Sequence, residues 1–176
     1  MARRSDSQEL TPQPGALVFA HSKSFIGWAI RLGERLRFRS GAFYNHVAIV
    51  DHQLPTGDWE IIEAVARGVA KGRLSEIAPG GSYAVVAVPN GARTRILGFA
   101  RSQLGKEYGW LSVVSVALQI ILPRWLHLPS FRSDRTWICS ALGGEAARFG
   151  GWLHDWPTIY RVVPSELYAA LNGIEL

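Results

Sequence analysis

The chain has 176 residues, of which 48% are hydrophobic and 19% are charged. This is enough for one domain with a real core, and it excludes both a disordered chain and two large domains. The formal net charge of +5 is explained most simply by solvated basic faces, with attraction to an anionic cell wall or membrane surface as the alternative. No zinc-finger, helix-turn-helix or RNA-binding motif is present, so specific binding of nucleic acid is not expected.

The first residues are basic and then polar, and they lack the apolar run of a secretory signal peptide. We therefore expect synthesis in the cytoplasm. Release to the cell wall by lysis, or carriage on a phage particle, would leave no mark in the sequence. Residues 1–14 are expected to be a flexible arm, and residues 15–176 a single domain.

Short apolar runs bounded by turn residues predict a set of strands. They lie at residues 15–20, 43–52, 58–66, 68–74, 82–89 and 158–163. The segment QLPTG (residues 53–57) contains proline and glycine, and it is expected to be the turn of a hairpin.

Apolar residues at helical spacing predict helices around these strands. They lie at residues 22–36, 92–105, 139–150 and 164–173. Residues 110–122 are apolar on nearly all sides, but this run is shorter than the roughly 20 residues of a membrane span. It predicts a buried helix, with a segment dipping into one lipid leaflet as the alternative. Helices around a mostly antiparallel sheet make an α+β fold.

Cys139 is the only cysteine. A free cysteine is most often a small buried apolar residue, but three local features favour a nucleophile here. Cys139 is predicted to begin a helix, where backbone N–H groups and the helix dipole stabilise a thiolate. The small residues after it, among them Ser140 and Gly143, allow close packing on a sheet. Trp137 could form a wall of a substrate cleft.

His46 is the best candidate for a general base among the five histidines, because it lies within a strand pattern of apolar residues. A polar side chain there is either paired or functional. If residues 53–57 close the hairpin, Glu63 faces His46 across it and can hold the imidazole. Glu60, of opposite strand parity, is the alternative. Cys139, His46 and Glu63 would then form a catalytic triad.

Seven segments of the chain form a recognisable series: GALVFA, SKSFIGWAI, YNHVAIV, EIIEAVARGV, LGKEYGW, WICSALGGEAARFG and VVPSELYAAL. In their order and spacing they resemble the circularly permuted papain-fold family, the YiiX-like relatives of NlpC-type cell-wall peptidases. In ordinary papain-like enzymes the cysteine precedes the histidine, whereas here His46 comes first and Cys139 last, as in the permuted branch.

The resemblance implies a papain-like domain whose mostly antiparallel sheet or small barrel is flanked by helices. It implies Cys139 as nucleophile, His46 as general base and Glu63 as the residue that orients His46. Tyr108 would help to bind an oxyanion, with a packed aromatic residue as the alternative. Trp137 and Ser140 would complete the substrate-binding residues.

Acyl transfer through a thioester on Cys139 is the chemistry that these residues favour. The first hypothesis is an amidase or peptidase acting on cell-wall peptides. The second is a lipid acyl hydrolase or acyltransferase, because Trp110 and Trp125 bracket the apolar segment and lecithin:retinol acyltransferase-type enzymes are more distant relatives. The third is a non-catalytic binding protein. No cofactor or metal is expected, since the histidines are scattered and only one cysteine is present.

Overall fold

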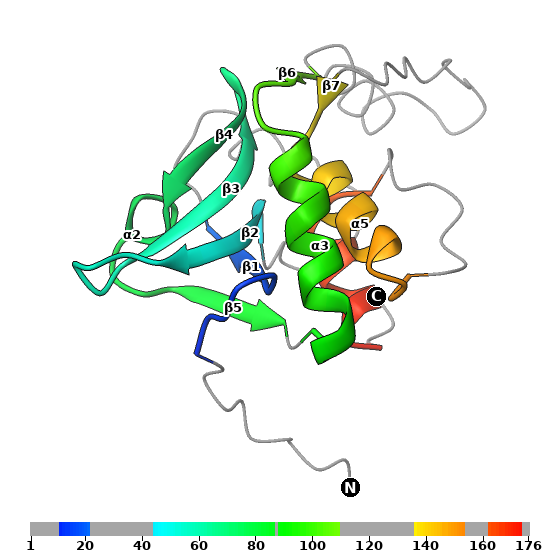
Figure 1. Ribbon diagram of the computed structural model, residues 1–176, viewed down its shortest axis with the longest axis horizontal. Helices are drawn as coiled ribbons and strands as arrows, with labels where there is room; N and C mark the ends of the chain where they lie inside the picture. Colours follow the sequence, from blue (N-terminus) through cyan, green and yellow to red (C-terminus); the bar gives the residue numbers. More distant parts are fainter. Residues whose placement is uncertain (1–10, 22–43, 87, 110–135, 154–161, 174–176) are drawn as a thin grey trace, which may run out of the picture.

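A computed structural model describes residues 11–21, 44–86, 88–109, 136–153 and 162–173. Its centre is a five-stranded antiparallel sheet in the order β4-β3-β2-β1-β5 (Figure 1). Within the described residues β4 and β5 are the edge strands and do not pair with each other, so the sheet is open and does not form the small barrel given as an alternative. The strands are β1 (Leu17–Ala20), β2 (His46–Gln53), β3 (Trp59–Val65), β4 (Gly68–Arg73) and β5 (Tyr83–Val86).

The helices surround this sheet and confirm the predicted α+β class (Figure 1). They are α2 (Leu74–Ile77), α3 (Asn90–Ser102), α5 (Cys139–Phe149) and α6 (Pro164–Leu171). The sequence placed the end of α3 at Gly105, but the helix ends three residues earlier. Gly105 instead forms a turn with φ +81°, and its N–H donates to the carbonyl of Val69 on β4 at 2.9 Å.

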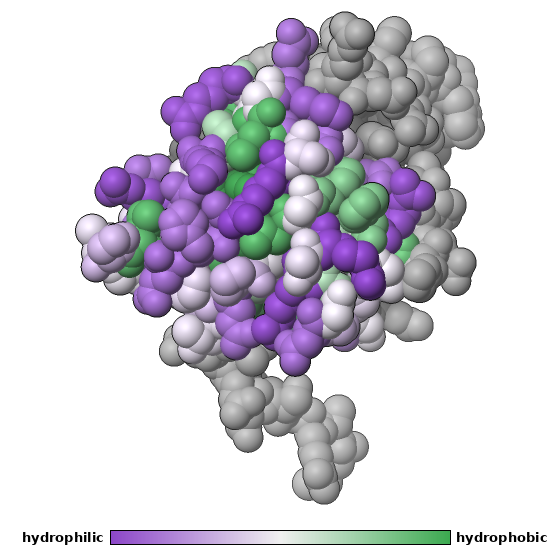
Figure 2. All heavy atoms as spheres, viewed as in Figure 1, coloured by the Kyte–Doolittle hydropathy of each residue, from purple (hydrophilic) through white to green (hydrophobic). Residues whose placement is uncertain are grey.

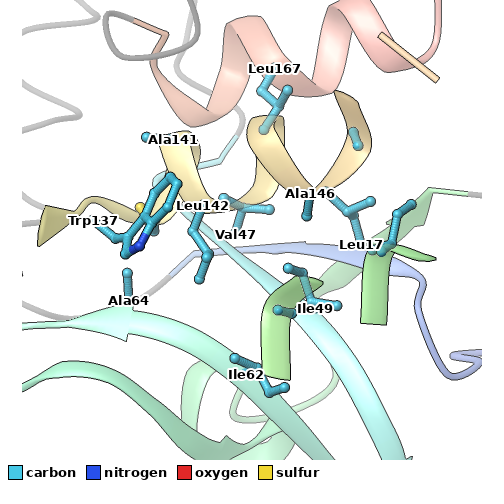
Figure 3. Close-up of a cluster of buried hydrophobic side chains, with 14 of the residues drawn as sticks. Leu17, Val47, Ile49, Ile62, Ala64, Trp137, Ala141, Leu142, Ala146 and Leu167 are labelled. Carbon is cyan, nitrogen blue, oxygen red and sulfur yellow. The ribbon is translucent and has the colours of Figure 1, made fainter. Parts of the chain in front are cut away.

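Both faces of the sheet are buried, which explains why its central strands are continuous apolar runs. On one face, Leu17, Val47 and Ile49 belong to a core that also contains residues of α3, α5 and α6. Figure 3 shows α5 between the sheet and α6, with Leu142 directed toward the sheet. The opposite face has a smaller core, closed by α2. That second core contains Ala16, Val18, Ala20, Ala48, Val50, Ile61, Leu74, Ile77 and Ala78.

The residues that α3 leaves exposed are polar or glycine, as expected of an amphipathic helix with one buried side. Figure 2 shows this face of the molecule with purple and white residues along α3 and apolar patches beside it. In the described part of the chain, no helix is both long enough and apolar enough to span a membrane.

Gly143 lets α5 approach the sheet closely. A Cβ atom at this position would lie 3.2 Å from Val47, 3.3 Å from Leu17 and 3.4 Å from Leu167. These distances are at the tight end of van der Waals contact, so a larger residue would push α5 away from the sheet or from α6. The predicted close approach of the two layers is therefore present at this residue.

The predicted register of the β2–β3 hairpin is wrong. Glu63 faces Ala48 rather than His46, so the true pairing is displaced by two residues. The turn causes the displacement, because it closes with the pair Leu54 and Asp58, whose N–H and carbonyl bond at 2.8 Å. A β-bulge between Val50 and His52 then moves the ladder back by one residue.

The strand predicted at residues 158–163 is not formed at Val162 and Val163. Val163 instead precedes α6, and its N–H donates to Glu166 Oε2 at 3.1 Å, which satisfies one N–H group at the helix start. Residues 158–161 lie outside the described residues. So do the predicted helices at 22–36 and 110–122, and residues 1–10 of the predicted arm.

Candidate active site

Cys139 is the first residue of α5 and is buried, with 5% of its surface exposed. The chain enters from the short strand β7 (Thr136–Trp137) through Ile138, which is extended and precedes the helix. The first N–H groups of a helix have no carbonyl of their own helix to bond, and they carry the positive end of its dipole. The sulfur therefore lies where a negative charge is stabilised.

Glu63 holds His46 by a hydrogen bond. The Nε2 atom of His46 lies 2.6 Å from Oε2 of Glu63, and both side chains are buried. The bond is diagonal, because Glu63 pairs with Ala48, and Ala48 lies two residues beyond His46 on the same face of β2. A carboxylate on Nε2 fixes the orientation of the imidazole ring, and it leaves Nδ1 free to face another group.

Cys139 is the second group that acts on this imidazole, through a side-chain hydrogen bond and its negative charge. Burial alone lowers the pKa of His46, but the hydrogen bonds to Cys139 and Glu63 and their negative charges outweigh burial and raise it from 6.5 to about 10. At neutral pH His46 is therefore an imidazolium between two acidic groups.

Tyr108 is brought beside the chain that leads into Cys139. It belongs to β6 (Glu107–Tyr108), which pairs in parallel with β7, so that Tyr108 faces Trp137. Burial and the negative charge of Cys139 raise the pKa of Tyr108 above its ordinary value, so its hydroxyl stays protonated. A protonated hydroxyl near the sulfur is a suitable hydrogen-bond donor to an oxyanion.

Trp137 and Ser140 are both covered by the fold. Trp137 has 7% of its surface exposed, and its ring packs edge-on against Phe99, with 5.8 Å between the ring centroids. Figure 3 shows the indole beside α5, above Ala64 of β3. Ser140, which follows Cys139 in α5, is 2% exposed. Their roles in substrate binding stay predictions.

Two further residues, one beside Glu63 and one farther along β2, were not singled out from the sequence. Gly72 on β4 lies against the carboxylate of Glu63, and the only signal for it was a glycine inside a predicted strand. Asp51, at the bulge of β2, is 1% exposed and accepts a bond from Arg101 of α3 at 2.7 Å. Glu60, the alternative to Glu63, is instead bonded to Lys71 at 2.6 Å.

The sequence matches the family described as permuted papain-like amidase enzyme, YaeF/YiiX, C92 family, over residues 11–115. The matched range includes His46, Glu63 and Tyr108 and ends before Cys139. The assignment of the nucleophile therefore rests on the geometry of this chain. None of the curated proteins matches the sequence.

Among solved structures, the metalloprotein yiiX from Escherichia coli O157:H7 has a similar fold, with a TM-score of 0.51 and 22% sequence identity. The similarity covers 78% of this chain and 65% of the E. coli chain. The predicted resemblance to YiiX-like proteins is confirmed by this fold and by the family match.

Because that relative is described as a metalloprotein, we tested whether the described residues of this chain suit a metal ion. Asp51, His52 and Glu60 place potential ligand atoms within 4.8 Å of one another. Lys71 Nζ, however, lies 2.6 Å from Glu60 and 3.4 Å from Asp51, and Arg101 lies 2.7 Å from Asp51. Two cationic side chains already compensate these carboxylates, so the group fits an ion-pair network rather than a metal site.

Proposed function

Because this chain belongs to the YaeF/YiiX family of permuted papain-like amidases, we propose that it is a cysteine hydrolase that cleaves amide bonds through a thioester on Cys139. The observation that carries the proposal is that His46 bonds Cys139 and Glu63 at the same time. Those three side chains supply the nucleophile, the general base and the orienting group that a papain-type reaction requires.

The first half of the reaction is acylation of the sulfur. The Cys139 thiolate attacks the substrate carbonyl carbon, and the carbonyl electron pair moves to its oxygen. The backbone N–H of Cys139 and the hydroxyl of Tyr108 donate to this oxyanion. As the C–N bond breaks, the His46 imidazolium gives its proton to the departing amine. A thioester on Cys139 remains.

The second half is hydrolysis of the thioester. His46, now neutral, takes a proton from water as the water oxygen attacks the thioester carbonyl. The C–S bond breaks, the acid product leaves, and the thiolate–imidazolium pair is restored. Glu63 stabilises each imidazolium state and keeps the ring from rotating, through its bond to Nε2.

As substrate we propose amide bonds of cell-wall peptide stems. The family description names an amidase, and the formal net charge of +5 suits a protein that approaches an anionic wall. The discriminating assay compares release of peptide from purified peptidoglycan with release of fatty acid from liposomes and with cleavage of a fluorogenic ester. Release from peptidoglycan alone is expected, and activity on lipid alone would contradict the substrate.

The reactivity of Cys139 tests the mechanism without knowledge of the substrate. An iodoacetamide probe should label the wild-type protein at pH 6 much faster than it labels a free thiol, and at pH 8 by a smaller margin. His46→Ala should lose this advantage at pH 6. His52→Ala is the matched control, because the His52 side chain is 49% exposed and lies outside the triad. Wild-type labelling at the free-thiol rate would refute the ion pair.

Replacement of the nucleophile tests the covalent step. Cys139→Ser should abolish both labelling and turnover, because a serine hydroxyl beside an imidazolium is not ionised. Retained turnover on peptidoglycan in this variant would show that another residue is the nucleophile.

A further inference from the structure

The carboxylate of Glu63 lies against Gly72 of β4, in the space where a Cβ atom of residue 72 would be. We propose that Gly72 is a positioning residue of the catalytic site, because its missing Cβ leaves the space that the Glu63 carboxylate occupies while it bonds His46. The inference rests on the catalytic roles proposed above, and it adds a fourth position on which those roles depend.

The space beside Gly72 is filled by Glu63 itself. A Cβ atom at Gly72 would overlap Oε1 of Glu63 and would lie 3.3 Å from the carboxyl carbon. Oε2 of the same carboxylate is the atom bonded to His46. The two oxygens of Glu63 therefore have different neighbours: Oε2 bonds and orients His46, and Oε1 packs against Gly72.

Backbone conformation does not explain a glycine at this position. Eight described glycines have positive φ, and Gly72 is not among them. An alanine could adopt its backbone angles without strain. Glycine inside a strand also weakens the strand, and it commonly marks a place where another group approaches closely. The reason for glycine here is the space it leaves.

Glu63 has little freedom to avoid a methyl group at position 72. Its side chain is 6% exposed, and it lies between Ala48 on β2 and Ala70 on β4. A rotation or withdrawal of the carboxylate would lengthen the 2.6 Å bond to His46. The carboxylate can therefore relieve the overlap only by weakening that bond.

The edge strand β4 is also restrained. It pairs with β3 along its whole length, from Gly68 to Arg73. Near its start, Val69 donates to Lys106 at 2.8 Å and accepts from Gly105 at 2.9 Å. At its end, the buried Leu74 begins α2. Retreat of β4 would break contacts at both ends, so we expect Glu63 to move instead.

The test is a double-mutant cycle read by labelling of Cys139 at pH 6 with an iodoacetamide probe. Gly72→Ala should slow labelling about tenfold or more, the loss expected when a catalytic group is displaced by a fraction of an ångström to one ångström. Glu63→Ala should slow it at least as much. Gly72→Ala added to Glu63→Ala should cause no further loss, since the carboxylate that it displaces is gone.

The control is Gly98→Ala, on the exposed side of α3, where an added Cβ has no neighbour within 4 Å. It should label like the wild type. A second readout is the pKa of His46, followed by NMR in labelled protein. Gly72→Ala should lower this pKa relative to the wild type, because the hydrogen bond that the His46 ring donates to Glu63 raises it. A role in stability alone would leave the pKa unchanged.

Wild-type labelling and an unchanged His46 pKa in Gly72→Ala would overturn the inference. A further loss in the double variant would also overturn it, because Gly72 would then act without Glu63. If Gly72→Ala fails to fold, the double variant should still fold, and its failure would refute the proposed overlap. If wild-type Cys139 reacts like a free thiol, the proposed function fails, whereas the His46 pKa still decides the role of Gly72.

Discussion

Glu63 bonds His46 across two neighbouring strands although the two residues are not paired in the ladder. The residue that faces Glu63 is Ala48, and the carboxylate reaches His46 diagonally, with 2.6 Å between Oε2 and Nε2. A diagonal contact spans more distance than a direct one, so the length of the glutamate side chain matters.

Shortening Glu63 should therefore damage the site more than neutralising it. Glu63→Gln keeps the reach, and its amide oxygen can still accept from the imidazolium, so we expect a loss of about tenfold in kcat from the weaker hydrogen bond. Glu63→Asp keeps the charge but loses one methylene group, which leaves the carboxylate short of His46, and we expect a loss closer to 100-fold. Steady-state kinetics of the two variants show which of them loses more kcat. Wild-type kcat in Glu63→Asp would show that reach is unimportant.

The ionisation of His46 should make stability depend on pH. Its pKa is raised from 6.5 to about 10 in the folded protein, so between these values the folded state holds a proton that the unfolded state has released. This contribution is complete below pH 6.5 and is lost as the pH rises through about 10. Melting temperatures from pH 6 to 11 should fall more steeply for the wild type than for His46→Gln. Parallel curves would contradict the raised pKa.

Tyr108 should affect turnover without affecting alkylation. Its hydroxyl is expected to donate to the oxyanion, which forms when a carbonyl is attacked and does not form with an iodoacetamide probe. Tyr108→Phe should lower kcat about 100-fold or more and leave the labelling rate of Cys139 unchanged. Tyr83→Phe, on the edge strand β5, is the matched control. A normal kcat in Tyr108→Phe would favour the packed-aromatic alternative.

Gly143 should tolerate no large side chain. Gly143→Val would place two methyl groups against Val47, Leu17 and Leu167, and we expect it to lower the free energy of unfolding by about 1–3 kcal/mol. Urea denaturation measures this loss. Gly98→Val provides the comparison, because Gly98 has open space around it. Equal stabilities of the two variants would show that α5 can move away from the sheet at no cost.

Asp51 should contribute to stability rather than to catalysis. Burial raises its pKa, but the bonds from Arg101 and His52 and the charges of Arg101 and Lys71 outweigh burial and hold the pKa below 3.8. The contribution is therefore present above pH 3.8 and lost as the pH falls through the lower folded value.

Asp51→Asn is the variant that tests this contribution. We expect it to lose about 1–3 kcal/mol at pH 7 in urea denaturation, and less at pH 3. Its labelling of Cys139 should match the wild type. Slow labelling would instead connect Asp51 to the triad.

The elements of the sheet were predictable because their signals are local. Short apolar runs and turn residues placed all five strands, and the two-residue period of a strand placed His46 and Glu63 on the same face of the hairpin. The register was not predictable in the same way. It depends on which residues close the turn and on the bulge between Val50 and His52, and neither leaves a clear mark in the apolar pattern.

Contacts between distant segments could not be predicted from the sequence pattern. The strands β6 and β7 have two residues each and are separated by a long stretch of chain, so no periodicity could reveal their parallel pairing. The relation of Gly72 to Glu63 was hidden for a different reason. A glycine in a strand indicates that something approaches, but the sequence does not say which side chain fills the space.

The pairing of β6 with β7 fixes Tyr108 relative to the start of α5 through the main chain. Tyr108 faces Trp137 in this ladder, and the N–H of Gly109 donates to the carbonyl of Trp137 at 2.9 Å. His46 and Glu63 belong to the separate five-stranded sheet. Side chains of β6 and β7 can therefore be exchanged to change the surroundings of the sulfur while the strands that hold the base stay as they are.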